Sequence, residues 1–329
     1  MTPVFSVLIP VYNQMGKMDP CVASLRAQTF ADFEVIWVDD GSTDGSGAFL
    51  DDLCREEPRF RVIHHEKNGS LTAARYTGMQ NARGQYICFL DSDDWWEADT
   101  LATLLQAFQA NPEADIIRFG LMMEPAHVPM LPINTDDFLR TYLEGKFPPA
   151  IWKNAYTAAL IRRALPFLEP FYCNMGEDTW YCGVFFGLSK KDVRLEKVLY
   201  HYAMGDGMSN TGSGSTMAKL KRDYDSVRAS GDHLLAFIRS NRPGYGTQAE
   251  KAVRLMRRFI LWQNMQNAPD YVTLVGYLNF FRDEGDESTY RFGCDDLLRY
   301  RILTDLKRND PRLADLPMPD LRTSMLEKE

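Results

Sequence analysis

Three clusters of polar and acidic side chains follow short apolar runs in the first third of the sequence. They are Pro10-Val-Tyr-Asn13, Asp39-Asp-Gly-Ser-Thr-Asp44 and Asp91-Ser-Asp-Asp94. Two carboxylates separated by one residue at a strand end can share a divalent cation, because Mg²⁺ and Mn²⁺ prefer oxygen ligands together with substrate phosphates. Each cluster alone is also consistent with a turn or a helix cap. Neither acidic cluster has the glycine and glutamate spacing of an EF-hand.

The apolar runs before these clusters predict the strands of a mostly parallel sheet. The expected strands are Val4–Ile9, Glu34–Val38, Arg61–His64, Gln85–Leu90 and Asp115–Phe119. Most are continuously apolar, as expected of strands buried on both faces. Helical spacing appears between them, at residues 18–25 and at 101–108, where Asp99 is the expected N-cap and Asn111-Pro112 the stop. This alternation predicts βαβ units, in which ligands bind beyond the carboxyl ends of the strands.

Composition and charge exclude several classes of protein. The chain has 329 residues, of which 45% are hydrophobic and 25% charged, as in soluble globular proteins. The net charge of -8 argues against nucleic acid as the main partner. The six cysteines form no C-x-x-C pair, which favours reduced thiols over a zinc site or a disulfide framework. With neither a long apolar run nor a basic leader, we expect a cytoplasmic protein.

Changes in pattern along the chain predict two regions. A proline-rich stretch at 125–149 reads as an insertion or lid, a second core follows to about residue 215, and helical spacing dominates from 216. We expect a catalytic domain at 1–215, divided into a nucleotide-binding half (1–120) and an acceptor half (121–215), with a helical region at 216–329. The tail is mildly basic and the preceding body acidic, which fits a tail that meets an anionic partner or simply solvated helix faces.

Taken together, the motifs are much more specific than each alone. They are Val7-Leu-Ile-Pro-Val-Tyr-Asn13, Gln28-Thr-Phe30, Val38-Asp-Asp-Gly-Ser-Thr-Asp44, Ala82-x-Gly-x-Tyr86 and Phe89-Leu-Asp-Ser-Asp-Asp94. In this order the sequence closely resembles the family 2 glycosyltransferases, inverting enzymes with the GT-A nucleotide-sugar fold. The resemblance is strong over about residues 3–120, moderate to about 215, and absent beyond. It implies an α/β, Rossmann-like, mostly parallel sheet flanked by helices, with a helical C-terminal extension.

The resemblance implies a nucleotide site in the first two loops. Tyr12 would stack on the base, Asp40 would hydrogen-bond the uracil or ribose, and Asp39 would support the loop. The residues that would contact the nucleotide-sugar are Pro10, Tyr12, Asn13, Asp39, Asp40, Arg75, Asp91 and Ser92.

The third loop then carries the D-x-D motif of the family. Asp93 would ligate Mn²⁺ or Mg²⁺ directly, and Asp91 would be shared between the ribose and the metal. The metal would neutralise the diphosphate leaving group, whose charge is the costly part of this reaction. Trp95 and Trp96 follow, as a sugar platform or as packing.

Glu177 and Asp178 resemble the acidic pair that the family has near the acceptor. An inverting transfer needs one carboxylate to take the proton of the acceptor hydroxyl. We assign this role to Asp178, with Glu177 positioning the acceptor. The alternative is that both are simply acidic residues suited to the first turn of a helix.

Two other features of the sequence allow two interpretations each. His201 is either a third metal ligand or a packed residue, and the following Gly205–Asn210 resembles a loop over the diphosphate, without the arginine often found there in relatives. The arginines of the tail could contact an anionic membrane or a lipid-linked acceptor, or could line a solvated helix face; they are Arg254, Arg257, Arg258, Arg299 and Arg301.

The sequence therefore predicts a metal-dependent inverting glycosyltransferase. The expected donor is a UDP-hexose or UDP-N-acetylhexosamine, and the expected acceptor is a hydroxyl of a glycan or lipid-linked glycan in cell-surface polysaccharide synthesis. One alternative is a sugar-nucleotide nucleotidyltransferase, although the loop after the first strand has a single glycine and no arginine to hold a triphosphate. The other is a sugar-nucleotide-binding protein without catalytic activity, which would not need both a D-x-D motif and an acidic pair.

Overall fold

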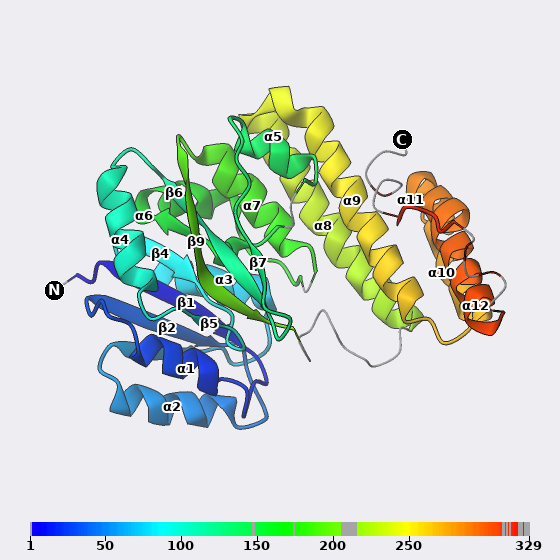
Figure 1. Cartoon of the computed structure of the whole chain (residues 1–329). Coiled ribbons are helices and arrows are strands. Elements are labelled where there is room, and N and C mark those ends of the chain that lie inside the picture. Colours follow the sequence, from blue (N-terminus) through cyan, green and yellow to red (C-terminus); the bar gives the residue numbers. More distant parts are fainter. Residues whose placement is uncertain are drawn as a thin grey trace. The chain divides into compact units, whose positions relative to one another are not determined.

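The computed structural model describes residues 2–146, 149–173, 175–204 and 216–310, and beyond them residues 313, 315, 317–321 and 325. The chain divides into two compact units (Figure 1). The first comprises residues 1–139 and 147–207, and the second comprises residues 140–146 and 208–329. Thus the stretch 140–146, expected in the acceptor half, belongs with the C-terminal unit. The expected boundary at residue 215 and the expected loop at 205–210 lie outside the described residues.

A single sheet organises the first unit. Among the described residues it has nine strands, ordered β3-β2-β1-β4-β8-β6-β9-β5, with β7 paired to β6. The strands are β1 (Phe5–Val11), β2 (Phe33–Asp39), β3 (Phe60–His64), β4 (Tyr86–Phe89), β5 (Trp95–Trp96), β6 (Ile116–Glu124), β7 (Val128–Met130), β8 (Asn154–Thr157) and β9 (Asp192–Ala203). Strands β1 to β4 are mutually parallel, and β6 is parallel to β9, whereas β8 and β5 are antiparallel to their neighbours. The predicted mostly parallel sheet is therefore confirmed.

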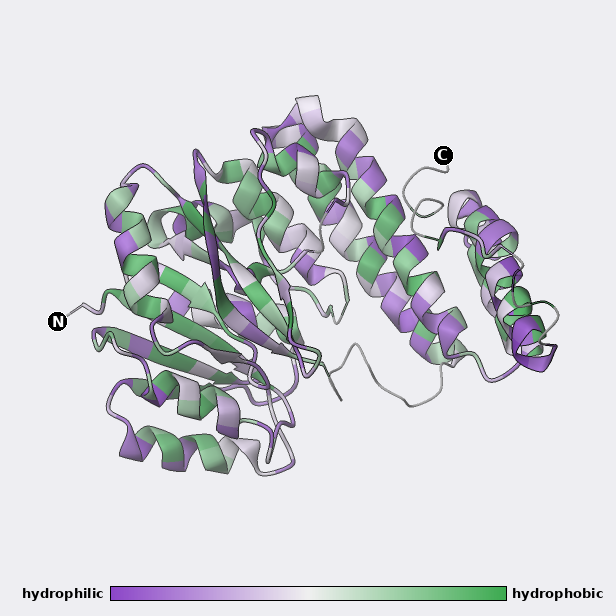
Figure 2. Ribbon diagram, viewed as in Figure 1, coloured by the Kyte–Doolittle hydropathy of each residue, from purple (hydrophilic) through white to green (hydrophobic). Residues whose placement is uncertain are grey.

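Helices cover both faces of this sheet. Their bounds are α1 (Asp19–Arg26), α2 (Ser46–Glu56), α3 (Leu71–Asn81), α4 (Thr100–Ala110), α6 (Ala158–Ala164) and α7 (Glu177–Leu188), with single 3₁₀ turns at Ile151–Lys153 and Leu165–Phe167. The short helix α5 (Phe138–Leu143) runs from the first unit into the second. On one face, apolar residues of α1, α2 and α4 share a core with Val7 and Ile9. On the other face, Leu8 lies against Gly78 of α3, and Phe89 stacks on Phe185 of α7. Figure 2 shows the strands as mostly hydrophobic.

The local sequence explains these elements. All seven residues of β1 and of β2 are buried, because both faces of the central strands are covered by helices. Asp99 is the residue before α4, and Asn111 ends that helix, as predicted. Within the proline-rich stretch after β6, expected to be an insertion or lid, β7 pairs with the end of β6 and α5 follows.

The second unit is helical. Its helices are α8 (Met217–Asn241), α9 (Gly246–Gln266), α10 (Tyr271–Asp283), α11 (Glu287–Phe292) and α12 (Arg299–Asn309), with a 3₁₀ turn at Pro243–Tyr245 and a π-helical turn at Gly293–Leu298. In Figure 2 hydrophilic and hydrophobic residues alternate along these helices, as in amphipathic helices with one packed face. None of the helices in the described ranges is long and apolar enough to cross a membrane.

Candidate active site

The loops after β1 and β2 are joined at the carboxyl edge of the sheet. The backbone N–H of Asn13 donates to Ser42 Oγ (3.0 Å), and the Asn13 side-chain oxygen accepts from the N–H of Thr43 (2.9 Å). The next two N–H groups, of Gln14 and Met15, donate to Ser46 Oγ (2.9 Å) and Asp44 Oδ2 (3.0 Å). This holds the first loop firmly. Pro10 is buried beside it, and the ring of Tyr12 remains 39% exposed, as a stacking face requires.

Two successive aspartates at the end of β2 are each held by a histidine: Asp39, the last residue of the strand, by His64 of β3, and Asp40 by the next residue, His65. Asp39 pairs in register with His64 of β3, whose Nδ1 lies 2.9 Å from Asp39 Oδ2. Burial raises the pKa of Asp39, but hydrogen bonds from Ser42 and His64 outweigh it, so the pKa is lowered overall. Asp39 therefore supports the loop as a buried carboxylate. The sequence analysis assigned no role to His64 and His65. Their position at the end of the strand next to β2 could have indicated that they bind the aspartates there.

Asp40 forms more hydrogen bonds within the protein than its expected role in nucleotide binding suggests. Its Oδ1 accepts from Gly69 N–H (2.9 Å) and lies 2.7 Å from His65 Nδ1, while Oδ2 accepts from Ser70 N–H (2.8 Å). A carboxylate has about four acceptor positions, so one remains on Oδ2. Asp40 is only 2% exposed, however, so a base or ribose would reach this position only after neighbouring side chains had moved.

The D-x-D loop follows β4 at the same edge. Asp94 is buried, and its carboxylate accepts from Tyr200 O–H of β9 and from Ala203 N–H (2.7 Å). Tyr200 Oη in turn accepts from Asp91 N–H (3.3 Å). Asp94 thus fixes the loop to β9. Ser92 is buried as well, so the expected contact between its side chain and a nucleotide-sugar is not available in this structure.

Arg75 joins the D-x-D loop to the acidic pair. From α3, its Nη2 donates to Asp91 Oδ1 (3.3 Å), and its Nη1 donates to Glu177 Oε1 (3.2 Å) and Asp178 Oδ1 (3.0 Å). The Arg75 side chain is 1% exposed. This corrects the sequence-based expectation that Arg75 contacts the nucleotide, because the guanidinium is buried among carboxylates. Arg75 thus binds Asp91 through one guanidinium nitrogen and both residues of the acidic pair through the other.

The carboxylates of this site outnumber its cations. The pKa of Asp178 is raised to about 7 overall: burial raises it most, Arg75 opposes burial, and Glu177 and Asp91 add to it. The pKa of Asp94 is raised to about 8, mainly by burial and next by Asp91. Burial and Asp91 also raise the pKa of Asp93. Such mutual repulsion is relieved when a cation enters the site.

The donor set fits a divalent cation that takes its other ligands from substrate and water. Asp93 is partly exposed and, in the part of the chain that the structure describes, forms no ion pair. The described residues contain no group of three or more side chains that could hold a metal alone. Mg²⁺ and Mn²⁺ sites with one or two carboxylates and phosphate oxygens have this composition.

His201 does not face the D-x-D carboxylates. Its Nδ1 lies 2.9 Å from Glu124 Oε1 and its Nε2 2.9 Å from Glu97 Oε1, and its ring stacks on Trp95 at 5.3 Å. Both ring nitrogens are therefore engaged, which contradicts its assignment as a metal ligand. Successive residues of a strand face opposite sides, so Tyr200, which sequence reasoning overlooked, reaches the D-x-D loop instead.

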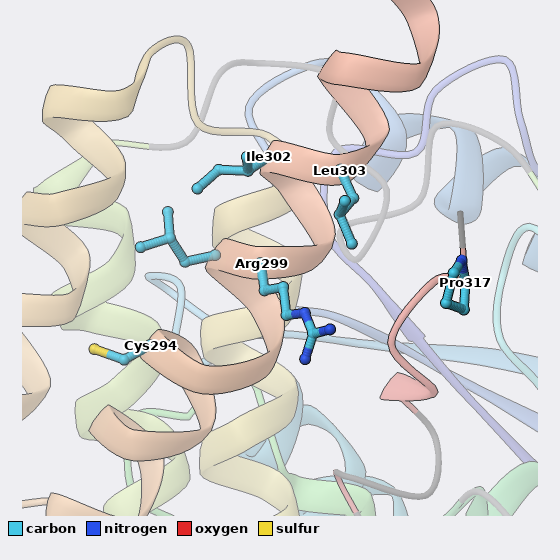
Figure 3. A pocket seen from close by; sticks show the side chains of 6 residues that line it. Cys294, Arg299, Ile302, Leu303 and Pro317 are labelled. Carbon is cyan, nitrogen blue, oxygen red and sulfur yellow. The ribbon is translucent and has the colours of Figure 1, made fainter. Parts of the chain in front are cut away.

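The tail arginines do not form one exposed basic patch. Arg258 is buried and donates to Met325 O (2.9 Å) and Ser288 Oγ (2.8 Å), and Arg257 lies 3.6 Å from Asp286. Arg301 donates to Met265 O (3.3 Å). Arg299 lines a small pocket of the second unit, with Cys294, Leu298, Ile302, Leu303 and Pro317 (Figure 3). The pocket contains none of the expected catalytic residues. Arg257, Arg258 and Arg301 are thus held by the second unit itself, whereas Arg299 is exposed; contact of the tail with a membrane or a lipid-linked acceptor stays a prediction.

Comparison with known proteins identifies the first unit. The model of "Glycosyl transferase family 2" matches residues 6–163, which include the first three loops and Arg75. This segment belongs to glycosyl transferase family 2. Over 216 residues the chain is 41% identical to "Putative glycosyltransferase EpsH" and 33% identical to "Uncharacterized glycosyltransferase EpsJ", both of Bacillus subtilis (strain 168). Each match covers 61% of this chain and 61% of the relative, so the chain spans less than two thirds of the length of either.

Two solved structures share the fold of this chain. Residues 1–349 of TarS from S. aureus, in complex with UDP-GlcNAc, align with a TM-score of 0.58 and 19% identity, covering 88% of this chain and 90% of that one. The mannosyltransferase PcManGT from Pyrobaculum calidifontis, in complex with GDP-Man and Mn²⁺, gives a TM-score of 0.55 and 17% identity, covering 99% and 86%. The family 2 segment of this protein therefore lies in a GT-A fold with C-terminal helices, as the sequence predicted.

Proposed function

We propose that this family 2 protein is a metal-dependent inverting glycosyltransferase that moves a sugar from a nucleoside diphosphate donor to a hydroxyl acceptor. The main observation in support is that Arg75 binds Asp91 of the D-x-D motif and Asp178 of the acidic pair at the same time. A donor-binding carboxylate and a base thereby share one site, as a direct displacement at the anomeric carbon requires.

The donor half is formed by the loops at the carboxyl edge. Tyr12 would stack on the base, and the remaining acceptor position of Asp40 would receive one hydrogen bond from base or ribose. Asp93, with Asp91 beside it, would hold Mn²⁺ or Mg²⁺. When bound, that ion would offset the charge of the departing diphosphate. TarS was solved with UDP-GlcNAc, which favours a UDP-sugar as donor.

The acceptor half is formed by the start of α7. Asp178 would accept the proton of the attacking hydroxyl, since it is more exposed than Glu177, with 21% against 10% of the side chain accessible. Glu177, held by the same guanidinium nitrogen, would orient the acceptor. A relative from Bacillus subtilis (strain 168), TuaG, is 36% identical over 104 residues and is named for teichuronic acid biosynthesis, which favours a glycan or lipid-linked glycan of a bacterial cell-surface polymer as acceptor.

A donor panel tests the proposal. The protein is incubated with Mn²⁺ and each common UDP- or GDP-sugar, with and without simple glycoside acceptors, and release of the nucleoside diphosphate is measured. Release that depends on Mn²⁺ and on Asp93 supports the proposal. Tight binding of a nucleotide-sugar without any release, across the panel, would favour a binding protein that has kept the fold.

A further inference from the structure

The proposed donor diphosphate needs a positively charged side chain beside it, and neither of the two expected positions, the segment 205–215 and Arg75, supplies one. The segment 205–215 contains no lysine or arginine. Arg75 is buried and its terminal nitrogens are used by three carboxylates. A diphosphate bound by one divalent cation keeps excess negative charge, so a further cation nearby would strengthen its binding.

Lys17 lies at the correct edge of the sheet to supply this cation. It follows the loop after β1 and precedes α1, which packs against β5, the strand directly after the D-x-D loop. Thr29 N–H, just beyond α1, donates to Ala98 O (2.9 Å), and Gln28 Nε2 donates to Glu97 O (2.8 Å), which tie that helix to the residues after β5. These bonds hold the C-terminal end of α1. Its start follows the loop after β1, and β1 is paired in parallel with β4, so this loop and the D-x-D loop leave neighbouring strands at the same edge of the sheet.

The pKa of Cys21, in the first turn of α1, agrees with this topology. Burial raises it most, and the D-x-D carboxylates raise it further.

The backbone holds Lys17 in place while leaving its ammonium accessible. Lys17 N–H donates to Gln14 O (3.0 Å), and Gln14 is itself bound to Ser46 Oγ. The preceding residue, Gly16, has a φ of +77°, a left-handed conformation that glycine adopts without strain, and so allows the turn that leads into Lys17. Lys17 is exposed and has no ion pair among the residues that the structure describes.

We infer that Lys17 binds the diphosphate of the donor, on the side of Asp93 away from Arg75. This inference rests on the proposed function, because it assumes a nucleoside diphosphate at the D-x-D loop. Lys17 is then a donor-binding residue that adds affinity for the phosphates and not for the nucleoside.

Binding calorimetry with Lys17→Gln tests the inference. UDP, GDP and uridine are titrated into the protein with Mn²⁺, with thermal unfolding as a check of folding. We expect Lys17→Gln to weaken binding of the nucleoside diphosphate about 5- to 20-fold, in keeping with loss of one charged hydrogen bond, and to leave uridine unchanged. The matched control is Lys190→Gln, an exposed lysine just before β9, at the opposite edge of the sheet, which should change neither.

The outcomes separate the inference from the function on which it rests. If the wild-type protein binds neither UDP nor GDP, the proposed function is overturned and the inference falls with it. If the wild type binds one of them and Lys17→Gln binds it within twofold, the inference alone is overturned. Unchanged nucleotide affinity with tighter Mn²⁺ binding would assign Lys17 to screening of Asp93, and would also overturn it.

Discussion

Arg75 Nη1 lies 3.0 Å from Asp178 Oδ1, although 103 residues separate them in the chain. The same guanidinium binds Glu177 and, through Nη2, Asp91. A buried cation on α3 therefore sets the distance between the D-x-D loop and the start of α7. Because this cation neutralises only part of the charge around it, the site stays negative and ready for a metal.

Replacement of Arg75 should destabilise the first unit strongly. Arg75→Leu leaves three carboxylates without their buried partner, and breaking such a pair costs about 3–5 kcal/mol. The free energy of unfolding, from urea titration at pH 7.5, should fall by this amount and recover in part at pH 5, where the carboxylates protonate. Arg55→Leu, at a 74% exposed side chain, should stay within about 0.5 kcal/mol; an equal loss there would contradict the prediction.

The pH dependence of transfer should report Asp178. Its pKa is raised to about 7, chiefly by burial, and a base acts only when deprotonated. We expect kcat/KM to rise with pH up to about 7 and then level off. The same raised pKa means that ionised Asp178 costs stability above its unfolded pKa, so the metal-free protein should lose stability as pH rises from about 4 through 7.

Asp178→Asn should separate binding from chemistry. Loss of a carboxylate base slows transfer about 10²- to 10⁴-fold, whereas binding of UDP and Mn²⁺ depends on the first three loops and should stay normal. The companion variant Glu177→Gln should retain more activity. If Glu177→Gln is inactive and Asp178→Asn active, the two roles are reversed; if both are active, the base lies elsewhere.

Asp93 should control the response to metal. We expect EDTA to abolish transfer and Mn²⁺ to restore it. Mn²⁺ with UDP should raise the Tm of the wild type, more at pH 8 than at pH 6, because ligands bind metal in their deprotonated form. Asp93→Ala should fold and show no such rise, while Glu113→Ala, on the exposed side before β6, should behave as the wild type. Full activity of the wild type in EDTA would refute the metal site.

Two glycines of the helical unit should respond oppositely to alanine. A Cβ at Gly231 of α8 would lie 2.8 Å from Val253 Cγ1 of α9, too close without movement of a stiff side chain, whereas a Cβ at Gly276 of α10 would meet only Met217 Cε at an ordinary 3.5 Å. Alanine favours a helix by about 1 kcal/mol over glycine, and overpacking costs about 1–3 kcal/mol. Gly276→Ala should raise the Tm and Gly231→Ala should lower it.

The sequence by itself determined the strands β1 to β4 and β6 and the identity of the acidic loops, but not β5, β7, β8 or β9. Runs of β-branched and aromatic residues such as Val35–Val38 favour strands covered on both faces, and the carboxyl ends of parallel strands meet at one edge, so Tyr12, Asp40 and Asp91 are expected near one another. Motif spacing also indicated the family, because several short motifs in a fixed order are far more specific than any one of them.

Only the tertiary structure decided how side chains pair across that edge. Whether Arg75 faces solvent or carboxylates depends on where α7 begins relative to α3, a contact between segments 100 residues apart that no local pattern encodes. Likewise, the register between β5 and β9 sets Tyr200 against Asp94 and turns His201 toward Glu97 and Glu124. A shift of one residue in that pairing would exchange the two side chains, since neighbours on a strand face opposite sides.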